Sequence, residues 1–377
     1  MQELHFVMPA DPDHPFPKKR ILFAPLNWGL GHVSRCIPLI QHLEKAGVDV
    51  ILASDGVAQH LLKAEFPHLT CLTLPSYKIR YFSNNMVLNI ARQLPRMLYA
   101  IRSEQWATEK IIREYGICGI ISDNRYGCFS TKVKSVILTH QLNLRIPNRV
   151  LQWGANQVLY KMLTKFDAVW VPDIESSNGL SAALAHPAGN LKNVTYIGLL
   201  SRAFAPTPVT NFDYDVAVIL SGPEPQRTYL EQVLLEQAMS LPHKFIFVQG
   251  KTKTKKHHYE APNIEVVSFL TSEELNKVLA ASRYIVCRSG YSSLMDLVGT
   301  GKRGILIPTP GQTEQEYLAE NLRRENLFIV QKQPKINLGE ALHQVKHTLG
   351  FNGTDFTVNT FQAKLDGWLQ RLTPVSQ

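Results

Sequence analysis

The sequence has few cysteines, and none of them are paired in a motif. The 377 residues include five, which are Cys36, Cys71, Cys118, Cys128 and Cys287. The number is odd, and no two are separated by only two residues. A disulfide scaffold or a Cys-x-x-Cys zinc or redox site is therefore not expected, and the pattern fits reduced, buried thiols in a cytoplasmic protein.

Long hydrophobic runs and paired acidic metal motifs are missing as well. No apolar run reaches the roughly 20 residues that span a bilayer. Residues 1–17 lack the basic-then-apolar order of a secretory signal and form a Pro-rich tail. Asp11-x-Asp13 lies in this tail, and Asp213-x-Asp215 precedes its strand, so neither could hold a cation at a strand end. We expect a cytoplasmic protein without a bound metal ion.

Positive charge is concentrated in the first half of the chain. Residues 1–205 hold 22 Lys and Arg against 14 Asp and Glu, whereas residues 206–377 hold 18 against 17. This asymmetry suggests that the first half meets an anionic partner, such as a phospholipid surface or a phosphorylated acceptor, or else carries an ordinary solvated basic face. Nucleic acid ranks lower, because the basic residues form no dense cluster with interleaved aromatics.

Short apolar runs alternate with helical patterns along the whole chain, which predicts α/β structure with parallel sheets. The expected strands are Ile21–Pro25, Val48–Ala53, Ile117–Ser122, Val136–Thr139, Ala168–Val171, Val216–Leu220, Phe245–Val248, Ile264–Val267, Tyr284–Cys287 and Ile305–Ile307. Two prolines in Ala205–Pro208 mark a boundary. We predict two Rossmann-like, doubly wound domains, 18–205 and 206–350, that face a cleft. A helix within 351–377 is expected to pack back on the first domain.

A glycine-rich loop, Asn27–His32, follows the first strand and opens a helix. Glycines let the backbone approach a ligand, and with Asp55 after the second strand the loop resembles part of a dinucleotide fingerprint, although Ser34 replaces its third glycine. His32 would lie at a helix N-terminus, where an imidazole tends to stay neutral and can accept a proton. An ordinary hydrogen-bonded loop histidine is the alternative.

Loops after strands of the second half carry polar groups suited to a nucleotide. Ser221-Gly222-Pro223 could cradle a phosphate. In the segment Cys287–Asp296, Gly290 permits a turn, and Arg288 with the following hydroxyls suits a diphosphate at a helix start. Asp296 either accepts hydrogen bonds from ribose hydroxyls or is an acid favoured by the helix dipole.

Two capping boxes are predicted in the same half. Thr271 and Glu274 fit one at the start of a helix, and Thr313 and Glu316 fit another. Gln315 and Glu316 could grip sugar hydroxyls, and Glu316 could instead hold the helix end. For Gln315 the sequence indicates no such structural role.

These motifs resemble those of GT-B glycosyltransferases, most closely family 28, which includes the peptidoglycan N-acetylglucosaminyltransferase. The resemblance is strongest in 268–317, with Ser-Phe-Leu, Cys-Arg-Ser-Gly, an acid eight residues after the arginine, and Gln-Glu-Tyr. It implies a two-domain fold and a nucleotide-sugar donor, with UDP favoured. It further implies donor-binding residues, which are Ser221, Gly222, Phe269, Leu270, Arg288, Ser289, Gly290, Ser292, Asp296, Gln315 and Glu316.

The resemblance extends more weakly to the acceptor side. It implies His32 as the catalytic base or as an orienting residue near the acceptor. Asp123 is the reserve candidate for the base, and it lies in the segment Ser122–Gly127, which follows a strand, has no obvious match in the family enzyme and is interpreted as acceptor chemistry of this subgroup. The expected acceptor-side residues are Gly29, Gly31, Arg35, Asn124, Arg125, His140 and Asn143. Arg35 stands where the family usually has a proline, and Glu316 stands where it has a glutamine, so neither the acceptor nor the sugar is assigned.

We therefore predict a metal-independent hexosyltransferase that needs no cofactor, because the nucleotide sugar is its substrate. A basic, aromatic-bearing stretch, Tyr77–Arg113, could lay the enzyme on an anionic membrane to meet a lipid-linked acceptor, or could be an ordinary surface helix. A saccharide acceptor is the alternative. The rival functions are a nucleotide-sugar epimerase or hydrolase and an NAD-dependent oxidoreductase, and no nucleic-acid partner is expected.

Overall fold

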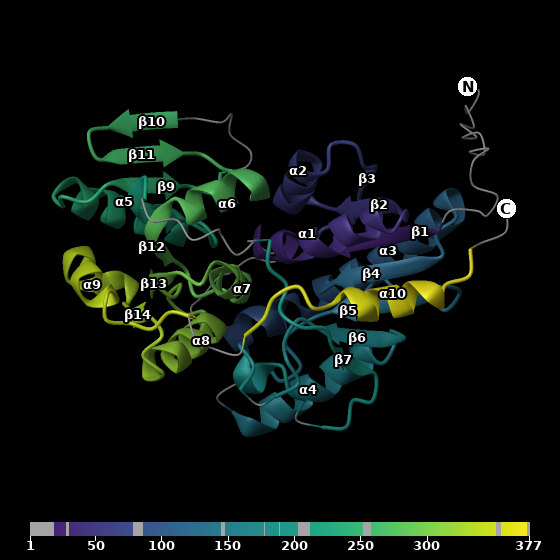
Figure 1. Ribbon diagram of the computed structural model, residues 1–377. Coiled ribbons are helices and arrows are strands. Elements are labelled where there is room, and N and C mark those ends of the chain that lie inside the picture. The colour runs from purple at the N-terminus through teal and green to yellow at the C-terminus, as the bar shows by residue number, and fades with distance from the viewer. Residues whose placement is uncertain are drawn as a thin grey trace.

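The computed structural model describes residues 19–27, 30–77, 86–144, 148–176, 178–187, 189–202, 212–251, 258–351 and 356–374, with the backbone alone for 30, 86–94 and 258–261. These residues form two seven-stranded sheets flanked by helices. Figure 1 shows the sheets as separate layers, with α1 and α7 between them. The predicted tail, Gly29 and the boundary at Ala205–Pro208 lie outside the described residues.

The first sheet has the strand order β3-β2-β1-β4-β5-β6-β7, and all its strands are parallel. Its elements are β1 (Arg20–Pro25), α1 (Leu30–Lys45), β2 (Asp49–Ser54), α2 (Gly56–Glu65), β3 (Cys71–Thr73), α3 (Met86–Tyr115), β4 (Gly119–Asp123), β5 (Lys134–Leu138), α4 (Arg149–Leu163), β6 (Ala168–Val171) and β7 (Val194–Tyr196). The strand order reverses between β1 and β4.

The second sheet has the order β10-β11-β9-β8-β12-β13-β14, in which only β10 pairs antiparallel among the described strands. Its elements are β8 (Tyr214–Ile219), α5 (Gln226–Met239), β9 (Phe245–Val248), β10 (His258–Ala261), β11 (Ile264–Val267), α6 (Ser272–Ala280), β12 (Ser282–Cys287), α7 (Tyr291–Thr300), β13 (Arg303–Leu306), α8 (Thr313–Arg324), β14 (Ile329–Val330) and α9 (Leu338–Val345). Here the order reverses between β8 and β12.

The predicted α/β architecture is confirmed. Every expected strand is present, and its ends shift by at most two residues. The structure adds four strands that the sequence analysis missed, β3, β7, β10 and β14, and these are the outer strands of the two sheets.

The last helix, α10 (Gln362–Gln370), packs on the first sheet rather than the second (Figure 1). Lys19 Nζ donates a hydrogen bond to the carbonyl of Leu369 over 2.7 Å, and the rings of Trp170 and Trp368 meet edge to face. Gly119 makes room, because a Cβ atom there would lie 2.8 Å from the Trp368 ring. Helix α10 therefore covers the first domain, although it follows the second domain in the sequence.

The two domains share a continuous hydrophobic core. One cluster of buried side chains includes Val33 and Ile37 of α1 together with Leu294 and Met295 of α7. Gly31, at the start of α1, favours this approach, since a Cβ atom there would lie 3.1 Å from the Ser292 hydroxyl, which is closer than ordinary van der Waals contact. The amino ends of α1 and α7 consequently face each other across the domain junction.

Candidate functional site

The predicted site residues gather at the two points where strand order reverses. Ligands of open α/β sheets bind beyond the carboxyl ends of strands at such points. In the first domain β1 leads into His32, and β4 ends at Asp123. In the second domain β8 leads into Ser221 and Gly222, and β12 leads into Arg288. The topology therefore brings together loops that are far apart in the sequence.

His32 and Asp123 form a hydrogen-bonded pair in the first domain. The Nδ1 atom of His32 lies 2.9 Å from Asp123 Oδ2, and the side chain of Asp123 is fully buried. Arg35 binds the other carboxylate oxygen through Nε at 3.1 Å and also through Nη2. Burial acts against ionisation of Asp123, but Arg35 and then His32 lower the pKa of this carboxyl below its usual value.

The environment of His32 favours the neutral imidazole. Burial lowers its pKa below 6.5, Arg35 acts in the same direction, and Asp123 opposes both without overcoming them. An ionised Asp123 accepts a hydrogen bond from protonated Nδ1, which leaves a lone pair on Nε2. The Nε2 atom has no hydrogen-bond partner in the described part of the chain, and the side chain is 17% exposed. His32 can therefore accept a proton from a bound ligand.

Arg125 corrects an expectation of the sequence analysis, because it cannot face an acceptor. Its guanidinium is fully buried and forms ion pairs with Glu104 at 2.6 Å and with Asp55. It also donates hydrogen bonds to the carbonyls of Pro25 and Pro75. These contacts bind β1, β2, α3 and β4 together, so Arg125 is structural. They also occupy Asp55, the residue expected to bind ribose in an NAD enzyme.

Two neighbouring polar residues have backbone or structural roles. Asn124 adopts a left-handed backbone (φ 55°), and its N–H donates to the carbonyl of Leu138. The Asn143 side chain accepts a hydrogen bond from Asn156 Nδ2 at 3.1 Å, contrary to the expected acceptor contact. His140, in contrast, lies within the site, since its Nδ1 atom is 3.1 Å from Arg35 Nη1.

Arg288 is a buried cation without a carboxylate partner among the described residues. Its Nη atoms donate to the carbonyls of Ile307, Pro308 and Gln226 at 2.9–3.2 Å. The Nε atom is buried and has no hydrogen-bond partner within the described ranges of the chain. Burial lowers the pKa of Arg288 to about 10. An uncompensated buried charge is costly, so this guanidinium suits an anionic ligand.

A second unpaired polar atom lies beside Arg288. The hydroxyl of Thr309 is buried without a hydrogen-bond partner in the described structure. A Cβ atom on Gly222 would lie 3.5 Å from this hydroxyl and 4.0 Å from Arg288 Nε. Gly222 itself has φ of 102°, which favours glycine. A guanidinium, a hydroxyl and a glycine backbone thus converge on one spot, and together they offer donors suited to a phosphate oxygen.

The amino end of α7 is engaged with the first domain. Ser292 Oγ donates a 2.7 Å hydrogen bond to the carbonyl of Gly31, and Ser289 Oγ donates to the carbonyl of Gln315. Gly290 is the N-cap residue of α7 and contributes no side-chain cap. The helix amides remain oriented toward the domain junction.

The carboxylate of Asp296 is also occupied. It pairs with Arg202 Nε at 3.1 Å and accepts hydrogen bonds from Ser201 Oγ and the Arg202 N–H. The sequence analysis expected a ribose ligand here. Ribose binding at Asp296 would require displacement of Arg202.

Gln315 and Glu316 hold the loop before α8, which corrects two expectations. The Oε1 atom of Gln315 accepts a hydrogen bond from the Thr309 N–H, and its Nε2 atom donates to Gln312. Gln315 therefore has a structural role that the sequence did not indicate. The predicted Thr313 capping box is wrong, because the N-cap residue is Gln312. Glu316 instead accepts a hydrogen bond from the Gly311 N–H at 3.2 Å.

The other capping box is formed as predicted. Thr271 is the N-cap of α6, and its side chain and that of Glu274 exchange hydrogen bonds with the two backbone amides. The box fixes the loop that contains Phe269 and Leu270, at the carboxyl end of β11. Leu270 packs against the main hydrophobic core, so its backbone is held in place at the sheet edge.

The sequence analysis missed Glu314, which comes from the second domain and touches the first. Its Oε1 atom lies 2.9 Å from His140 Nε2, and Oε2 accepts a hydrogen bond from the Gln141 side chain. The ring of His140 stacks on Tyr291, with centroids 4.1 Å apart. Side chains of both domains therefore meet beside the His32–Asp123 pair.

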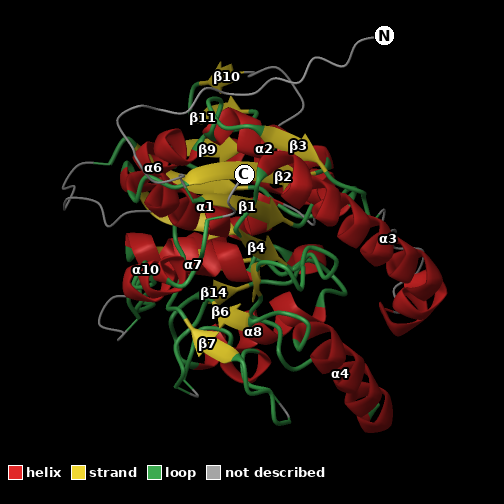
Figure 2. Ribbon diagram, turned by 90° about the vertical axis from the view of Figure 1, so that its right-hand side faces the viewer, coloured by secondary structure: helices red, strands yellow, loops and turns green. Residues whose placement is uncertain are grey.

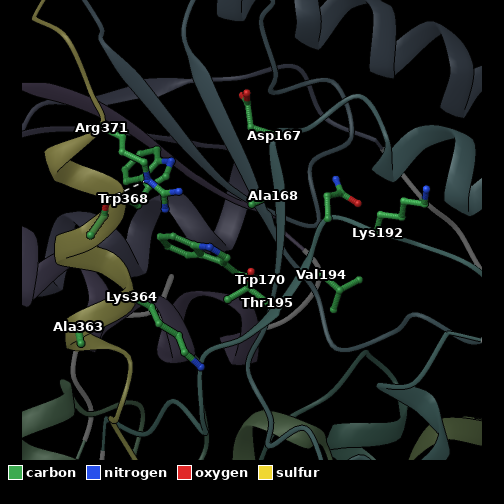
Figure 3. A pocket seen from close by; sticks show the side chains of 12 residues that line it. Asp167, Ala168, Trp170, Lys192, Val194, Thr195, Ala363, Lys364, Trp368 and Arg371 are labelled. Atoms are coloured by element: carbon green, nitrogen blue, oxygen red, sulfur yellow. Dashed lines mark hydrogen bonds between the residues drawn. The ribbon is translucent and has the colours of Figure 1, made fainter.

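A separate cavity of about 370 Å³ lies against α10, far from these residues. Figure 3 shows Trp170 and Lys364 beside it, with Lys192 at its far side. It is lined by the residues at which β6 and β7 begin, Ala168 and Val194, whereas the candidate site lies at carboxyl ends of strands. This cavity is therefore distinct from the candidate site.

Comparison with known proteins places the chain among sugar-transferring enzymes. Residues 217–360 match the profile of the glycosyltransferase family 28 C-terminal domain. A UDP-N-acetylglucosamine–N-acetylmuramyl-(pentapeptide) pyrophosphoryl-undecaprenol N-acetylglucosamine transferase of Campylobacter jejuni subsp. doylei is 22% identical over 244 residues, which are 59% of this chain and 70% of the relative. A glycosyltransferase of Methanosarcina acetivorans, described as uncharacterized, is 21% identical over 361 residues, with 90% and 93% covered.

Solved structures share the fold. The crystal structure of the glycotransferase of kitacinnamycin superposes with a TM-score of 0.59 at 14% identity, covering 94% of this chain and 95% of that one. The similarity therefore extends over both domains and the junction between them.

Proposed function

The chain is a glycosyltransferase of the GT-B fold, similar to family 28 enzymes, and we propose that it moves a hexose-type sugar from a UDP-linked donor to a lipid-linked acceptor. One observation carries the proposal. A neutral histidine held by a buried aspartate lies at one strand-order reversal, and unpaired phosphate-type donors lie at the other. The first arrangement suits a proton acceptor, and the second suits a diphosphate leaving group.

The proposed donor site centres on Arg288, Thr309 and Gly222. As the bond between the sugar C1 and the diphosphate oxygen breaks, negative charge grows on the diphosphate. Hydrogen-bond donors fixed in advance stabilise such charge most effectively in a buried site. Among the residues that the structure describes, Arg288 Nε and the Thr309 hydroxyl have no hydrogen-bond partner that a ligand would have to displace. The amide groups at the start of α7 would add a favourable dipole. With these donors the reaction needs neither a metal ion nor a cofactor.

His32 is the proposed base. Its Nε2 atom would take the proton of the acceptor hydroxyl while the acceptor oxygen bonds to the sugar C1. Asp123 would hold the proton on Nδ1 and stabilise the imidazolium that forms. Asp123 itself is fully buried and bound by Arg35, which argues against it as the base. It is better suited to orient His32.

The remaining donor contacts follow from the loops around this site. We assign the nucleotide base to the backbone at Leu270, and the ribose to Asp296 in exchange for Arg202. The Campylobacter relative acts with a UDP-linked sugar, as its name states, and this supports UDP over other nucleotides. The sugar itself stays unassigned.

Exposed aromatic side chains support a membrane-borne acceptor. On α3, Tyr99 is 76% and Trp106 is 70% exposed, and on α4, Trp153 is 67% exposed. Figure 2 shows both helices projecting from the same side of the molecule. Tryptophan and tyrosine favour the membrane interface, and Arg96 and Arg102 on α3 would attract anionic lipid. No helix in the described part of the chain is long and apolar enough to cross a membrane.

A flotation assay tests the membrane surface. The full chain should float with vesicles that contain anionic phospholipid and stay behind with neutral ones. A variant with both Trp106→Ser and Trp153→Ser should lose most of this binding. Equal flotation of the variant would refute a role for the α3–α4 surface, and a saccharide in solution would become the preferred acceptor.

Calorimetric titration of the metal-free protein tests the donor assignment. UDP should bind, while GDP and NAD should not. Sugar interconversion or hydrolysis without any added acceptor would favour an epimerase or hydrolase instead. Binding of NAD in place of UDP would overturn the proposal, although Arg125 already occupies Asp55.

A further inference from the structure

Glu314 links the second domain to the proposed base through an unbroken row of polar side chains. It lies in the first turn of α8 and reaches the side chains of His140 and Gln141 in the first domain. His140 in turn contacts Arg35, and Arg35 contacts both Asp123 and His32. The row exists only while the two domains are in contact.

The contacts of His140 determine which of its nitrogens carries a proton. Arg35 Nη1 lies 3.1 Å from His140 Nδ1, and a guanidinium can only donate hydrogen bonds. The Nδ1 atom must therefore accept, so the proton of the neutral ring is on Nε2. There it points to Glu314 Oε1 at 2.9 Å. The stacked ring of Tyr291 restricts rotation of the imidazole. One tautomer of His140 is thus selected by groups from both domains.

The opposite tautomer is needed at His32, and Arg35 influences it. The Nδ1 atom of His32 is 2.9 Å from Asp123 Oδ2 and 3.0 Å from Arg35 Nη2. Asp123 favours a proton on Nδ1, whereas a donor such as Arg35 favours a lone pair there. If Arg35 were free to turn wholly toward His32, the proton would shift to Nε2 and the base would be blocked. Contact with His140 holds Arg35 away from that arrangement.

We infer that Glu314 is a positioning residue that makes His32 a competent base only when the domains are closed. It fixes His140 as the Nε2–H tautomer, His140 retains Arg35 on Asp123, and the proton of His32 stays on Nδ1. The Nε2 lone pair is then available to the acceptor. The inference rests on the proposed role of His32 in sugar transfer. It explains how activation of the acceptor could wait until the donor domain has engaged, which would protect the nucleotide sugar from water.

The charges around His32 predict the direction of a pH effect. Facing it are Asp123 from β4, Arg35 from its own helix α1, His140 from the loop after β5, and Glu314 from α8. Tyr126 lies near Asp123 and is neutral, since burial raises its pKa to about 12. The Glu314 carboxylate stabilises the cationic form of His32, so its removal should lower the pKa of His32.

Ring-nitrogen NMR of histidine in the full-length protein reads these tautomers directly. The signals of His32 and His140 would be assigned with His32→Ala and His140→Phe variants. In the unaltered protein near neutral pH, His140 should carry its proton on Nε2 and His32 on Nδ1. Glu314→Ala should mix the tautomers of His140, shift His32 toward Nε2–H and lower its pKa. Glu314→Gln, which keeps an acceptor oxygen, should preserve the His140 tautomer but still lower the pKa of His32.

Glu65→Gln is the matched control. The Glu65 carboxylate also crosses between the domains, where it accepts hydrogen bonds from the N–H and hydroxyl of Ser272 at 2.8 and 2.9 Å. It has no contact with His140. This variant should leave both histidine signals unchanged. If Glu65→Gln alters them as Glu314→Ala does, or if Glu314→Ala alters neither, the inference is overturned.

Kinetics provide the second readout. Glu314→Ala should lower kcat by about 10- to 100-fold through misplacement of the base, with little change in the donor KM, and should move the acid limb of the kcat profile to lower pH. A lower kcat with an unmoved acid limb would mean a merely structural role and would refute the inference. The NMR result does not depend on sugar transfer, so failure of the proposed function remains distinguishable.

Discussion

Both strand-order reversals contain a fully buried arginine, Arg125 in the first domain and Arg288 in the second, and the partners of these two side chains differ. Arg125 of the first domain is neutralised by Glu104 and Asp55. Burial acts against its charge and is the largest single effect, but Glu104, Cys128 and Asp55 together raise the pKa of Arg125 above its usual value. Arg288 of the second domain has no carboxylate partner in the described structure, and burial lowers its pKa to about 10.

The contrast separates a structural charge from a binding one. A buried ion pair with both partners present contributes to the fold and has little left to offer a ligand. A buried charge that the fold leaves unpaired costs stability, and an anionic ligand can repay that cost. The strand-order reversal of the first domain therefore positions His32 as a proton acceptor, whereas that of the second domain offers hydrogen-bond donors to a phosphate. Three predictions test this division.

The largest expected effect is on turnover at the first reversal. His32→Ala should lower turnover by about 10²–10⁴-fold, the usual contribution of a general base, while UDP affinity stays nearly unchanged. Because the pKa of His32 lies below 6.5, activity of the unaltered enzyme should be retained at pH 6.5 and lost only at lower pH, as the imidazole takes up a proton. Initial rates at saturating donor over a pH series provide the measurement.

His42→Ala is a matched control for this prediction. His42 lies on the same helix and also pairs with an aspartate, Asp366, at 2.7 Å, but it is remote from the reversal. Its substitution should leave turnover intact. Equal losses in the two variants would show that damage to α1, rather than removal of a base, accounts for the effect of His32→Ala.

The sequence predicts the interior of the fold much better than its edges. Central strands such as β1 and β12 contain apolar runs, Ile21–Pro25 and Tyr284–Cys287, because helices cover both faces of a parallel sheet. The missed strands β3, β7, β10 and β14 are the outer strands of their sheets, each pairing with one neighbour only. They are also short, and β7 is only half-buried throughout. Their pairing depends on the neighbouring strand rather than on their own composition.

The site shows the same limit at the level of single residues. The ion-pair partners of Arg125 are 21 and 70 residues away in the sequence, so the residues around Arg125 do not indicate that it is buried and paired. In α8, a capping box at Thr313 would have started the helix one residue later. Each residue turns a helix by about 100°, so neighbouring side chains of α8 face different directions, and the docking of the helix decides which of them meets the first domain. The structure selects Glu314, whereas the motif had pointed to Gln315 and Glu316.

The second prediction compares the two arginines directly by stability. Arg125→Met should lower the free energy of unfolding by about 3–5 kcal/mol, because it leaves Glu104 and Asp55 without their buried partner. Arg288→Met should lower the free energy of unfolding clearly less. It removes three hydrogen bonds to carbonyls, but it also removes a buried charge that no carboxylate compensates, which offsets part of the loss. Urea unfolding at neutral pH gives both values. Should Arg125→Met fail to fold, Tyr77→Phe, which removes one hydrogen bond to Glu104, should cost about 1 kcal/mol. An equal loss of free energy of unfolding in Arg125→Met and Arg288→Met would show that Arg288 also has a structural role.

The smallest effect is the most specific, because it concerns one hydroxyl. Thr309→Val replaces a buried hydroxyl that has no hydrogen-bond partner in the described part of the protein, so the free energy of unfolding should change by less than about 0.5 kcal/mol. UDP affinity should fall about tenfold through loss of one hydrogen bond to the diphosphate. Thr348→Val should lower the free energy of unfolding and leave UDP affinity unchanged. The buried Thr348 hydroxyl donates a hydrogen bond to the carbonyl of Val345 at 2.8 Å, away from the site. Calorimetry and urea unfolding on both variants separate the two roles. Unchanged UDP affinity in Thr309→Val would remove this hydroxyl from the phosphate site and leave Arg288 as its remaining unpaired side-chain donor.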